Sequence, residues 1–182
     1  MREKYKFKPF IIFFTGISAS GKSTICLNLK EKFKKFGFKK VKNIDGDYFR
    51  KKLQNFNYKN ISRDKVGDYK ISIARKFFKK RYIVLVSGVA HKKSWRKKIK
   101  ETNKDYFEVY LKCSVKICEK RDYKKQYIKA KSGVINNFIG VNEPYQVGRT
   151  NDLTINTSSL SIAKSINKVL NFLIKKKYVY KK

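Results

Sequence analysis

The sequence predicts an α/β protein of three layers, in which a mostly parallel sheet carries helices on both of its faces. Short apolar runs alternate with longer segments of helical periodicity along the chain. The apolar runs are continuous rather than alternating, which is typical of strands buried on both faces of a parallel sheet. The length of 182 residues and the hydrophobic content of 41% suit a single domain spanning residues 1–182.

The first predicted strand leads directly into a glycine-rich loop and then into a helix. Residues 9–14 form the apolar strand, and residues 16–23 read G-I-S-A-S-G-K-S, which fits the phosphate-binding pattern G-x-x-x-x-G-K-[ST]. The helix that follows repeats apolar residues at helical spacing, at Ile25, Leu29, Phe33 and Phe36. Strand, loop and helix follow one another in the order that a nucleotide site requires.

The residue types of this loop explain how it would hold a nucleotide. Gly16 and Gly21 let backbone N–H groups turn toward an oxyanion where a side chain would intrude. Lys22 can reach the β- and γ-phosphates as a point charge, and the Ser23 hydroxyl can ligate Mg²⁺. The helix that starts here points its free N–H groups and its dipole at the phosphates. We therefore predict a nucleotide phosphate site with Mg²⁺ at this loop.

The same patterns predict the other elements. Further strands are expected at residues 41–44, 82–86, 106–111 and 153–155, and helices at residues 62–80, 95–100, 114–121 and after residue 155. Ser114 is expected to cap the third of these helices. The spacing of apolar residues predicts the buried faces of two helices, namely Ile71, Ile73, Ala74 and Phe77 in the first, and Leu160, Ala163, Val169, Leu170 and Leu173 in the last.

Two carboxylates follow the short strand at residues 41–44. Asp45 and Asp47 flank a glycine at the point where this strand ends. Open α/β sheets bind their ligands beyond the carboxyl ends of the strands. We therefore expect both carboxylates at the ligand-binding edge of the sheet.

Residues 122–150 differ in character from the rest of the chain. This segment is polar and contains three glycines, and four lysines lie in its first ten residues. A long segment of this kind inside a compact domain is usually functional, often as a lid over the active site. We expect a lid at residues 122–150.

The formal net charge of +34 raises the question of a nucleic-acid partner. The excess is mostly lysine and is spread over nearly every segment rather than gathered on one face. Phe, Ile, Asn and Tyr are abundant as well, and all of these residues share A/T-rich codons. Drift of the genome composition explains this bias, so we expect no direct nucleic-acid binding, although so positive a field attracts anionic nucleotides.

The N-terminus and the cysteines bear on the compartment. Basic residues 1–8 and apolar residues 9–14 loosely imitate a signal peptide, but the apolar run is too short and the cleavage site would fall inside the phosphate loop. No apolar run approaches the length of a membrane span. Three cysteines, no C-x-x-C and a single histidine argue against a disulfide framework or a zinc site. We expect a cytoplasmic protein without a membrane partner, in which Cys26, Cys113 and Cys118 are buried reduced thiols.

Several segments match the motifs of one kinase family. Residues 16–24 read G-I-S-A-S-G-K-S-T against the family's G-L-S-G-S-G-K-S-T, and residues 44–50 read I-D-G-D-Y-F-R against L-D-G-D-N-V-R. Residues 107–122 contain F-E-V-Y-L and I-C-E-K-R-D, similar to F-I-E-V-F-V and I-C-E-A-R-D. Residues 127–133 and 137–145 are similar to Y-K-K-A-R-A-G, N-F-T-G-I and P-Y-E. On these motifs the chain resembles the adenylylsulfate (APS) kinases, P-loop kinases that phosphorylate the 3′-hydroxyl of APS to make PAPS.

The resemblance covers most of the chain and implies a P-loop kinase fold, ATP and Mg²⁺ as cofactors, and a homodimer. Lys22 and Asp47 become the candidate catalytic residues, with Asp47 orienting and deprotonating the acceptor hydroxyl. Ser23 and Asp45 become the metal-site residues, with Asp45 serving Mg²⁺ through water, and Asp45 is also assigned to the acceptor-binding residues. The ATP contacts would come from Gly16, Ser18, Ser20, Gly21, Lys22, Ser23, Thr24 and Arg121.

The resemblance also assigns acceptor contacts. Arg50 and Arg63 would hold the 5′-phosphate side of the acceptor, where a planar guanidinium suits bidentate contacts to oxyanions. Phe138 in the lid would stack on the acceptor base, with Tyr58 opposite, although the match at Tyr58 needs a one-residue deletion. The lid lysines Lys129 and Lys131 would close over the phosphates and the acceptor.

The acceptor side departs from the family's motifs. Tyr48 replaces an asparagine, and the family's D-R-x-x-N-I-R-R appears at residues 62–69 as S-R-D-K-V-G-D-Y, which keeps only Arg63. Asp68 in place of a cation should weaken the hold on a multiply anionic acceptor. The family's S-F-I-S-P-Y-R becomes S-G-V-A-H-K-K at residues 87–93, a loop that contains His91, either a substrate contact or an incidental residue. A site built on hydrogen bonds discriminates strongly when such contacts change.

Two acceptors stay open on this reading. The first is APS, with a changed but functional acceptor site. The second is another nucleotide with a comparable ribose hydroxyl, such as the cytidine diphosphoramidate used by similar enzymes of capsule pathways. An alternative hypothesis of a different functional class is that the protein is not an enzyme but a basic nucleic-acid-binding module. A kinase for a small metabolite such as shikimate lacks support from the lid motifs.

Overall fold

The centre of the molecule is a five-stranded parallel sheet. The structure, a computed structural model, describes residues 5–45, 60–148 and 151–181. The strand order is β3-β4-β2-β5-β6, and every neighbouring pair in it is parallel. Strands β2 and β4 are buried along their whole length, which is why their sequences are continuously apolar. The strands are β2 (Phe10–Thr15), β3 (Val41–Ile44), β4 (Ile83–Ser87), β5 (Tyr106–Lys112) and β6 (Leu153–Asn156).

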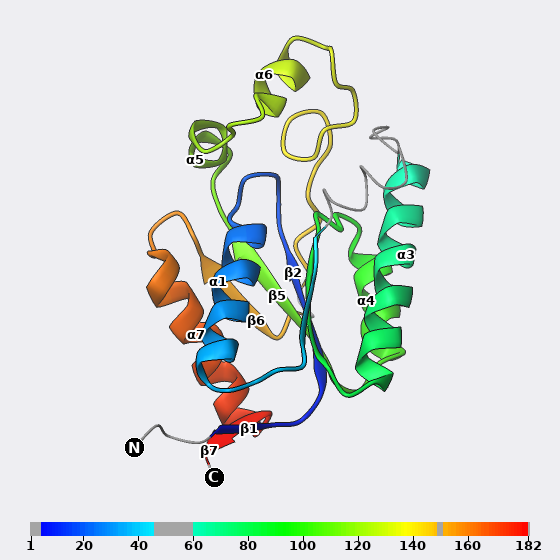
Figure 1. Cartoon of the computed structure of the whole chain (residues 1–182). Helices are drawn as coiled ribbons and strands as arrows, with labels where there is room; N and C mark the ends of the chain where they lie inside the picture. The colour runs from blue at the N-terminus through cyan, green and yellow to red at the C-terminus, as the bar shows by residue number, and fades with distance from the viewer. Residues whose placement is uncertain (1–4, 46–59, 149–150, 182) are drawn as a thin grey trace.

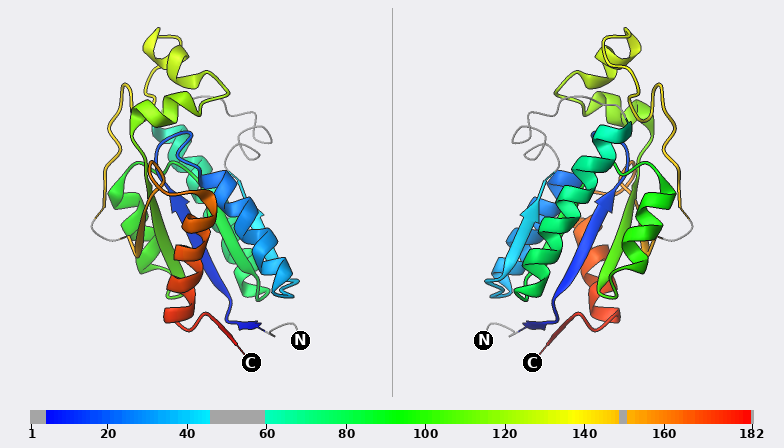
Figure 2. Two further views of the ribbon diagram at one scale, coloured as in Figure 1. Left: turned by 90° about the vertical axis from the view of Figure 1, so that its left-hand side faces the viewer. Right: turned by 90° about the vertical axis from the view of Figure 1, so that its right-hand side faces the viewer.

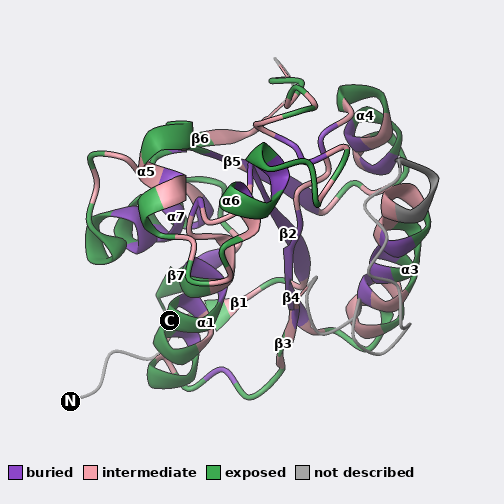
Figure 3. Ribbon diagram, turned by 90° about the horizontal axis from the view of Figure 1, so that it is seen from above, coloured by how far each residue is buried: buried purple, intermediate pink, exposed green. Residues whose placement is uncertain are grey.

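Two helices cover each face of this sheet (Figures 1 and 2). Residues 10, 12 and 14 of β2 join the apolar core under α1 and α7, and residues 11 and 13 join the core under α3 and α4. This division follows from the strand pleat, which points successive side chains to opposite faces. Figure 3 shows β2, β4 and β5 largely buried between helices whose outer faces are exposed. The helices are α1 (Lys22–Lys35), α3 (Asn60–Lys79), α4 (Lys93–Glu101) and α7 (Ile162–Lys175).

Two short helices and a long irregular segment lie beyond the carboxyl ends of the strands, at the same end as the phosphate loop (Figure 1). The helices are α5 (Val115–Lys120) and α6 (Gln126–Lys131). We call residues 122–148, the described part of the predicted lid, the cap segment. A third apolar cluster joins this segment to the phosphate loop, because Tyr127, Phe138 and Ile139 pack with Ile17.

The two ends of the chain meet at the opposite end of the sheet. Strand β1 (Tyr5–Phe7) pairs antiparallel with β7 (Val179–Lys181), and this two-stranded ribbon lies below the five-stranded sheet in Figure 1. Among the helices of the described ranges, none combines the length and the apolar character needed to cross a bilayer.

The predicted fold class is confirmed, with differences in detail. The predicted helix at residues 62–80 runs from residue 60 to residue 79, and Ser114 caps α5 by accepting a hydrogen bond from the backbone N–H of Ile117. Ala163 was expected to face inward, and this is wrong: it is exposed, and Ser165 and Ile166 are buried instead. Val169, Leu170 and Leu173 are buried as predicted, whereas Ala163 lies in the exposed first turn of α7 and Leu160 precedes the helix.

The cysteine prediction also needs a correction. Cys26 and Cys118 are buried as expected, but Cys113 is only half-buried. It lies just after the last residue of β5, where the chain leaves the sheet.

Candidate active site

The phosphate loop connects β2 to α1, and its backbone demands glycine at two positions. Gly16 has a φ of 144°, and a Cβ there would lie 2.7 Å from the carbonyl oxygen of Leu111 and 2.9 Å from Oγ of Ser20. Gly21 has a φ of 95° and is the N-cap residue of α1. Both φ values lie in the region that only glycine adopts without strain. The loop therefore owes its course to these two glycines.

Lys22 lies over the loop that precedes it. Its ammonium group donates to the carbonyl oxygen of Ile17 at 2.5 Å and to Oγ of Ser20 at 3.3 Å. Ser18, Gly21, Lys22, Ser23 and Thr24 all line one cavity of about 620 Å³. The cavity therefore opens directly onto the N-terminus of α1, where free N–H groups attract an anion.

Gly16 and Ser20 do not line this cavity, although both were predicted as ATP contacts. Ser20 is fully buried, and its Oγ accepts the hydrogen bond from Lys22. Gly16 lies against the carbonyl oxygen of Leu111. Both residues shape the loop from behind, and a direct contact of either with ATP stays a prediction.

A carboxylate and two hydroxyls meet at the floor of the cavity. Oγ of Ser23 donates to Oδ2 of Asp45 at 2.5 Å, and Oγ of Ser87 donates to the same oxygen at 2.9 Å. Asp45 follows β3 and Ser87 ends β4, so the parallel sheet itself brings them together. Carboxylate and hydroxyl oxygens are the hard ligands that Mg²⁺ prefers, and Mg²⁺ is usually held by one or two carboxylates and waters. This donor set fits Mg²⁺, with Ser23 and Asp45 as its protein side.

Arg121 forms part of the wall at the far end of the cavity. Its guanidinium donates to the carbonyl oxygen of Thr157 at 2.9 Å, and the Thr157 hydroxyl donates to the carbonyl oxygen of Ser20 at 3.0 Å. Arg121 and Thr157 both line the cavity. The residue just before the cap segment is thus connected to the phosphate loop through the turn after β6.

Tyr127 makes a second connection between the cap segment and the phosphate loop. Its side chain is buried, and its hydroxyl donates to the carbonyl oxygen of Ser18 at 3.0 Å. Burial raises the pKa of the Tyr127 hydroxyl well above its ordinary value, so this group remains a proton donor. The ring packs edge-on against Phe138, with the ring centroids 5.0 Å apart. The cap segment is therefore held against the loop by a hydrogen bond and an aromatic pair.

The structure distributes the predicted acceptor residues in different ways. Arg63 lines a second, smaller cavity of about 40 Å³ and donates to the carbonyl oxygen of Asn137 in the cap segment. Phe138 is buried against Tyr127 and is not among the residues that line either cavity. Lys129 and Lys131 lie exposed on α6, and Lys131 forms an ion pair with Glu119. Asp47, Arg50 and Tyr58 lie outside the described residues, so their roles stay predictions.

Two residues of the changed acceptor side can be compared with the structure, Asp68 on α3 and His91 in the loop at residues 87–93, which we call the acceptor loop. Asp68 does not line either cavity; its carboxylate accepts a hydrogen bond from Nε1 of Trp95 at 2.9 Å. His91 is buried and lines the smaller cavity. Burial lowers the pKa of His91, and the nearby positive charge of Arg63 lowers it further, so its imidazole is mainly neutral near pH 7.

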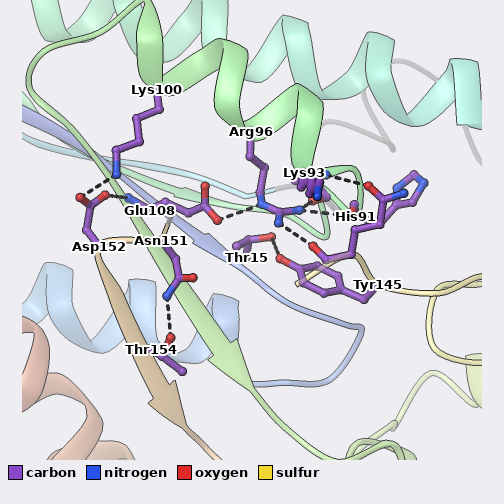
Figure 4. A network of polar contacts seen from close by, with 12 residues as sticks. Thr15, His91, Lys93, Arg96, Lys100, Glu108, Tyr145, Asn151, Asp152 and Thr154 are labelled. Atoms are coloured by element: carbon purple, nitrogen blue, oxygen red, sulfur yellow. Dashed lines mark hydrogen bonds and ion pairs between the residues drawn. The ribbon is translucent and has the colours of Figure 1, made fainter. Parts of the chain in front are cut away.

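The acceptor loop is anchored by a buried arginine (Figure 4). Nε of Arg96 on α4 donates to Oε1 of Glu108 on β5 at 2.9 Å, and its Nη1 donates to the carbonyl oxygen of Ala90 at 2.7 Å. Its Nη2 donates to the carbonyl oxygen of Gln146 at 2.6 Å, in the cap segment. One guanidinium therefore ties the sheet, the acceptor loop and the cap segment together.

Four residues of the site were not predicted from the sequence, and they are Lys70, Ser87, Arg96 and Tyr127. Ser87 ends the most strand-like run of the chain, next to the edge where ligands bind, and that position was the available signal. Nothing in the sequence separates Lys70 or Arg96 from the many other basic residues, because their burial depends on the packing of helices against the sheet.

The fold and the site together define a P-loop phosphotransferase. A parallel sheet carries the phosphate loop after its central strand, and a serine and a carboxylate are paired beside the loop lysine. This arrangement is what a site for the transfer of a phosphoryl group requires.

Comparisons with known proteins identify the family. The sequence profile of the family described as adenylylsulphate kinase matches residues 8–156. The adenylyl-sulfate kinase of Halothermothrix orenii is 30% identical over 173 residues, which is 94% of this chain and 93% of that protein. The adenylyl-sulfate kinase of Clostridium kluyveri is 33% identical over 177 residues, with 95% and 88% of the two chains covered. The chain therefore belongs to the adenylylsulphate kinase family and is a phosphotransferase with an alcohol group as acceptor.

Solved structures agree with this assignment. The Mycobacterium tuberculosis APS kinase CysC in complex with AMPPNP and APS has a TM-score of 0.84 and 27% identity, and the match covers 93% of this chain and 99% of that chain. A shikimate kinase from Aquifex aeolicus, with a TM-score of 0.57 and 12% identity, shares the fold alone.

Proposed function

We propose that this protein transfers the γ-phosphate of ATP to the 3′-hydroxyl of adenylylsulfate, which gives PAPS. The observation that carries the proposal is the single cavity that joins the phosphate loop to the carboxylate at the strand edge and extends to Val66, Gly88 and Val89. Donor and acceptor can therefore meet within one cavity. The mycobacterial relative, which was solved with AMPPNP and APS, supports this choice of substrates.

The residues of the chain supply positioning and charge, which is what phosphoryl transfer asks of a protein. Lys22 would neutralise charge on the β- and γ-phosphates as the bond to the leaving oxygen lengthens. Ser23 and Asp45 would hold Mg²⁺, which would offset the negative charge of the phosphates during the transfer. Asp47, which follows Asp45 by two residues, would orient the acceptor hydroxyl and take its proton.

Arg121 and the cap segment would complete the ATP side. The Arg121 guanidinium lies on the cavity wall, where its planar face can cover the nucleotide base. Tyr127 holds the cap segment to the loop, so the cap segment would keep water away from the transferring phosphoryl group. Exclusion of water favours transfer to the acceptor over hydrolysis of ATP.

A second acceptor is favoured by one specific observation. The wall of the cavity beyond Asp45 carries Val66 and Gly88 where the family's motifs have an asparagine and a phenylalanine. A site with these changes could suit another nucleotide with a free ribose hydroxyl, such as a cytidine diphosphate derivative.

The deciding experiment is an ADP-release assay with ATP and Mg²⁺, run against APS and against a panel of adenosine and cytidine diphosphate derivatives. Turnover with APS that exceeds turnover with every other acceptor supports the proposal. Turnover with a cytidine derivative but not with APS rejects APS and keeps the transfer reaction. Lys22→Ala is the control, since it should abolish turnover with any acceptor.

The non-catalytic alternative is tested on the same protein. Salt-dependent binding to duplex DNA, together with no release of ADP from any acceptor, would favour a nucleic-acid-binding module over a kinase. The arrangement of Lys22, Ser23 and Asp45 around one cavity supports the enzyme, because a DNA-binding surface has no use for it.

A further inference from the structure

A lysine is buried between the sheet and α3. Lys70 is 5% exposed, and its ammonium group donates to the carbonyl oxygen of Ser87 at 2.9 Å. The same group lies 5.8 Å from the centroid of the Phe13 ring. Lysine is rarely buried to this degree, because taking its charge out of water costs free energy unless polar partners surround it. The burial of Lys70 is therefore unusual and requires a structural or functional explanation.

The space that the ammonium group occupies exists because residue 88 is a glycine. A Cβ at Gly88 would lie 2.4 Å from Nζ of Lys70 and 3.2 Å from the Phe13 ring. The backbone of Gly88 does not have a positive φ, so its conformation does not itself require glycine. The family's S-F-I-S-P-Y-R motif has a phenylalanine at this position. In this chain the glycine and the lysine therefore form a matched pair, in which a cation takes the place of a side chain at residue 88.

Lys70 stands where the two cavities of the site meet. It lines the large cavity together with Asp45 and Ser87, and it lines the small cavity together with Arg63 and Lys92. The reacting phosphate and the acceptor's own anionic group must lie on opposite sides of the acceptor ribose. A cation at the junction of the two cavities is therefore placed between the transfer point and Arg63.

The charges around the small cavity favour an anion. Arg63, Lys70 and Lys92 contribute positive charge, and the one carboxylate among the lining residues, Asp64, is paired with Lys92 at 2.8 Å. Asp68 accepts its hydrogen bond from Trp95 and does not line the cavity. Asp68 therefore adds no negative charge to the lining of the cavity, and the charge of Asp64 is offset by Lys92.

We propose that Nζ of Lys70 is a specificity-determining contact of this enzyme, which binds a phosphate or sulfate oxygen of the acceptor nucleotide, and that Gly88 makes the room for it. The inference rests on the proposed function, because it requires an acceptor nucleotide in this part of the cavity. Lys70 compensates for the two arginines that Asp68 and Tyr69 replace, from a position one residue further along the helix. The acceptor site has changed its cation rather than lost it.

The test compares Lys70→Met with the wild-type enzyme. Methionine keeps the unbranched side chain as far as Cε and removes the ammonium group, with its charge and its donors. The KM for the acceptor should rise about tenfold to a hundredfold, as expected for the loss of a hydrogen bond to a charged group, while the KM for ATP should stay within about twofold. Lys76→Met, an exposed lysine on the same helix, is the matched control and should leave both values unchanged.

Gly88→Ala gives an independent route to the same result. The added methyl group collides with Nζ of Lys70 and should raise the acceptor KM without removing the lysine. If Lys70→Met fails to fold, as judged by its thermal unfolding, Gly88→Ala decides the question alone. An acceptor KM that is unchanged in a folded Lys70→Met protein, or in Gly88→Ala where only that variant folds, would overturn the inference and leave the proposed function standing.

The acceptor panel identifies the oxygen that Lys70 binds. An equal loss for APS, AMP and CDP in the Lys70→Met variant assigns Nζ to the phosphate next to the ribose, and a loss confined to APS and CDP assigns it to the terminal group. Direct titration of these nucleotides into the wild-type protein with ADP and Mg²⁺ separates the two hypotheses. Binding without turnover rejects the proposed function alone, and absence of all binding overturns both.

Discussion

The guanidinium of Arg96 and the carboxylate of Glu108 form an ion pair that is buried from solvent, with 2.9 Å between Nε and Oε1 and side-chain exposures of 0% and 1%. Oε2 of Glu108 has no hydrogen-bond partner among the described residues, whereas Arg96 also donates to backbone oxygens of Ala90, His91 and Gln146. Figure 4 shows this pair at the centre of a polar network that extends to Thr15 and Tyr145. The pair thus connects the sheet to the acceptor loop and to the cap segment.

We expect Arg96→Met to destabilise the protein by about 3–5 kcal/mol, because it leaves the Glu108 carboxylate buried without its counter-charge. Adding Glu108→Gln should recover only part of this loss, since the carbonyl oxygens of Ala90 and Gln146 remain without their donor. Urea unfolding of the two variants and the wild-type protein measures both quantities. Full recovery in the double variant would show that the loop contacts of Arg96 contribute nothing.

The same pair predicts a dependence of stability on pH. Burial raises the pKa of Glu108, and the charge of Arg96 opposes this shift. A carboxyl group whose pKa is raised on folding stabilises the protein below its unfolded pKa and loses that contribution as the pH rises through its folded pKa. The free energy of unfolding of Arg96→Met should therefore fall more between pH 4 and pH 8 than that of the wild-type protein. A parallel fall in both proteins would contradict the assigned coupling.

Asp45→Asn should raise the Mg²⁺ concentration needed for half-maximal activity by about tenfold or more, because a neutral amide replaces the carboxylate that the Ser23 and Ser87 hydroxyls orient. Titration of Mg²⁺ at saturating ATP measures this change, and EDTA should abolish the activity of the wild-type enzyme. Glu101→Gln removes an exposed carboxylate on α4 and is the control. An unchanged Mg²⁺ requirement in Asp45→Asn would remove Asp45 from the metal site.

The phosphate-loop side of the molecule could be predicted from sequence because its information is local. The positive φ values of Gly16 and Gly21, the helix start at Lys22 and the strand before the loop all follow from a few adjacent residues. The pairing of Ser23 with Asp45 was also accessible, since parallel strands bring their carboxyl ends to one edge.

The acceptor side could not be predicted in the same way, since its chemistry depends on packing between distant segments. The sequence predicts that the charge of Asp68 weakens binding of the acceptor, yet its carboxylate accepts a hydrogen bond from Trp95 of α4 and does not line either cavity. Lys70 read as one more surface lysine, yet the absence of a side chain at Gly88 leaves room for it in the interior. Such pairings join residues about 20 to 30 positions apart, and no local pattern encodes them.

Tyr127→Phe should weaken the connection between the cap segment and the phosphate loop. The variant removes the hydrogen bond to the carbonyl oxygen of Ser18 and keeps the ring against Phe138. Loss of one such bond costs about 0.5–1.5 kcal/mol, so the KM for ATP should rise about two- to tenfold. Initial-rate kinetics measure the effect, with Tyr180→Phe on β7 as the control. If the KM for ATP does not change, the bond does not contribute to nucleotide binding.

Cys113 should be the first of the three cysteines to react with iodoacetamide. Burial alone would raise the pKa of its thiol, but hydrogen bonds from Ser158 and Cys118 and the charge of Arg121 outweigh that effect and lower it. Oγ of Ser158 and Nη1 of Arg121 each lie 3.6 Å from its sulfur. The other two thiols are buried, and burial raises the pKa of Cys26 well above its ordinary value and that of Cys118 to about 12. Because the thiolate is the reactive form, mass spectrometry after brief treatment near pH 8 should find the label on Cys113.

ATP should slow this labelling, because Arg121 lines the nucleotide cavity and lies next to the Cys113 sulfur. Ser158→Ala should also slow it, since the variant loses a donor that stabilises the thiolate. Labelling of Cys113 that proceeds at the same rate with and without saturating ATP and Mg²⁺ would mean that the bound nucleotide does not reach this end of the cavity. In that case Arg121 would have to be removed from the ATP-binding residues.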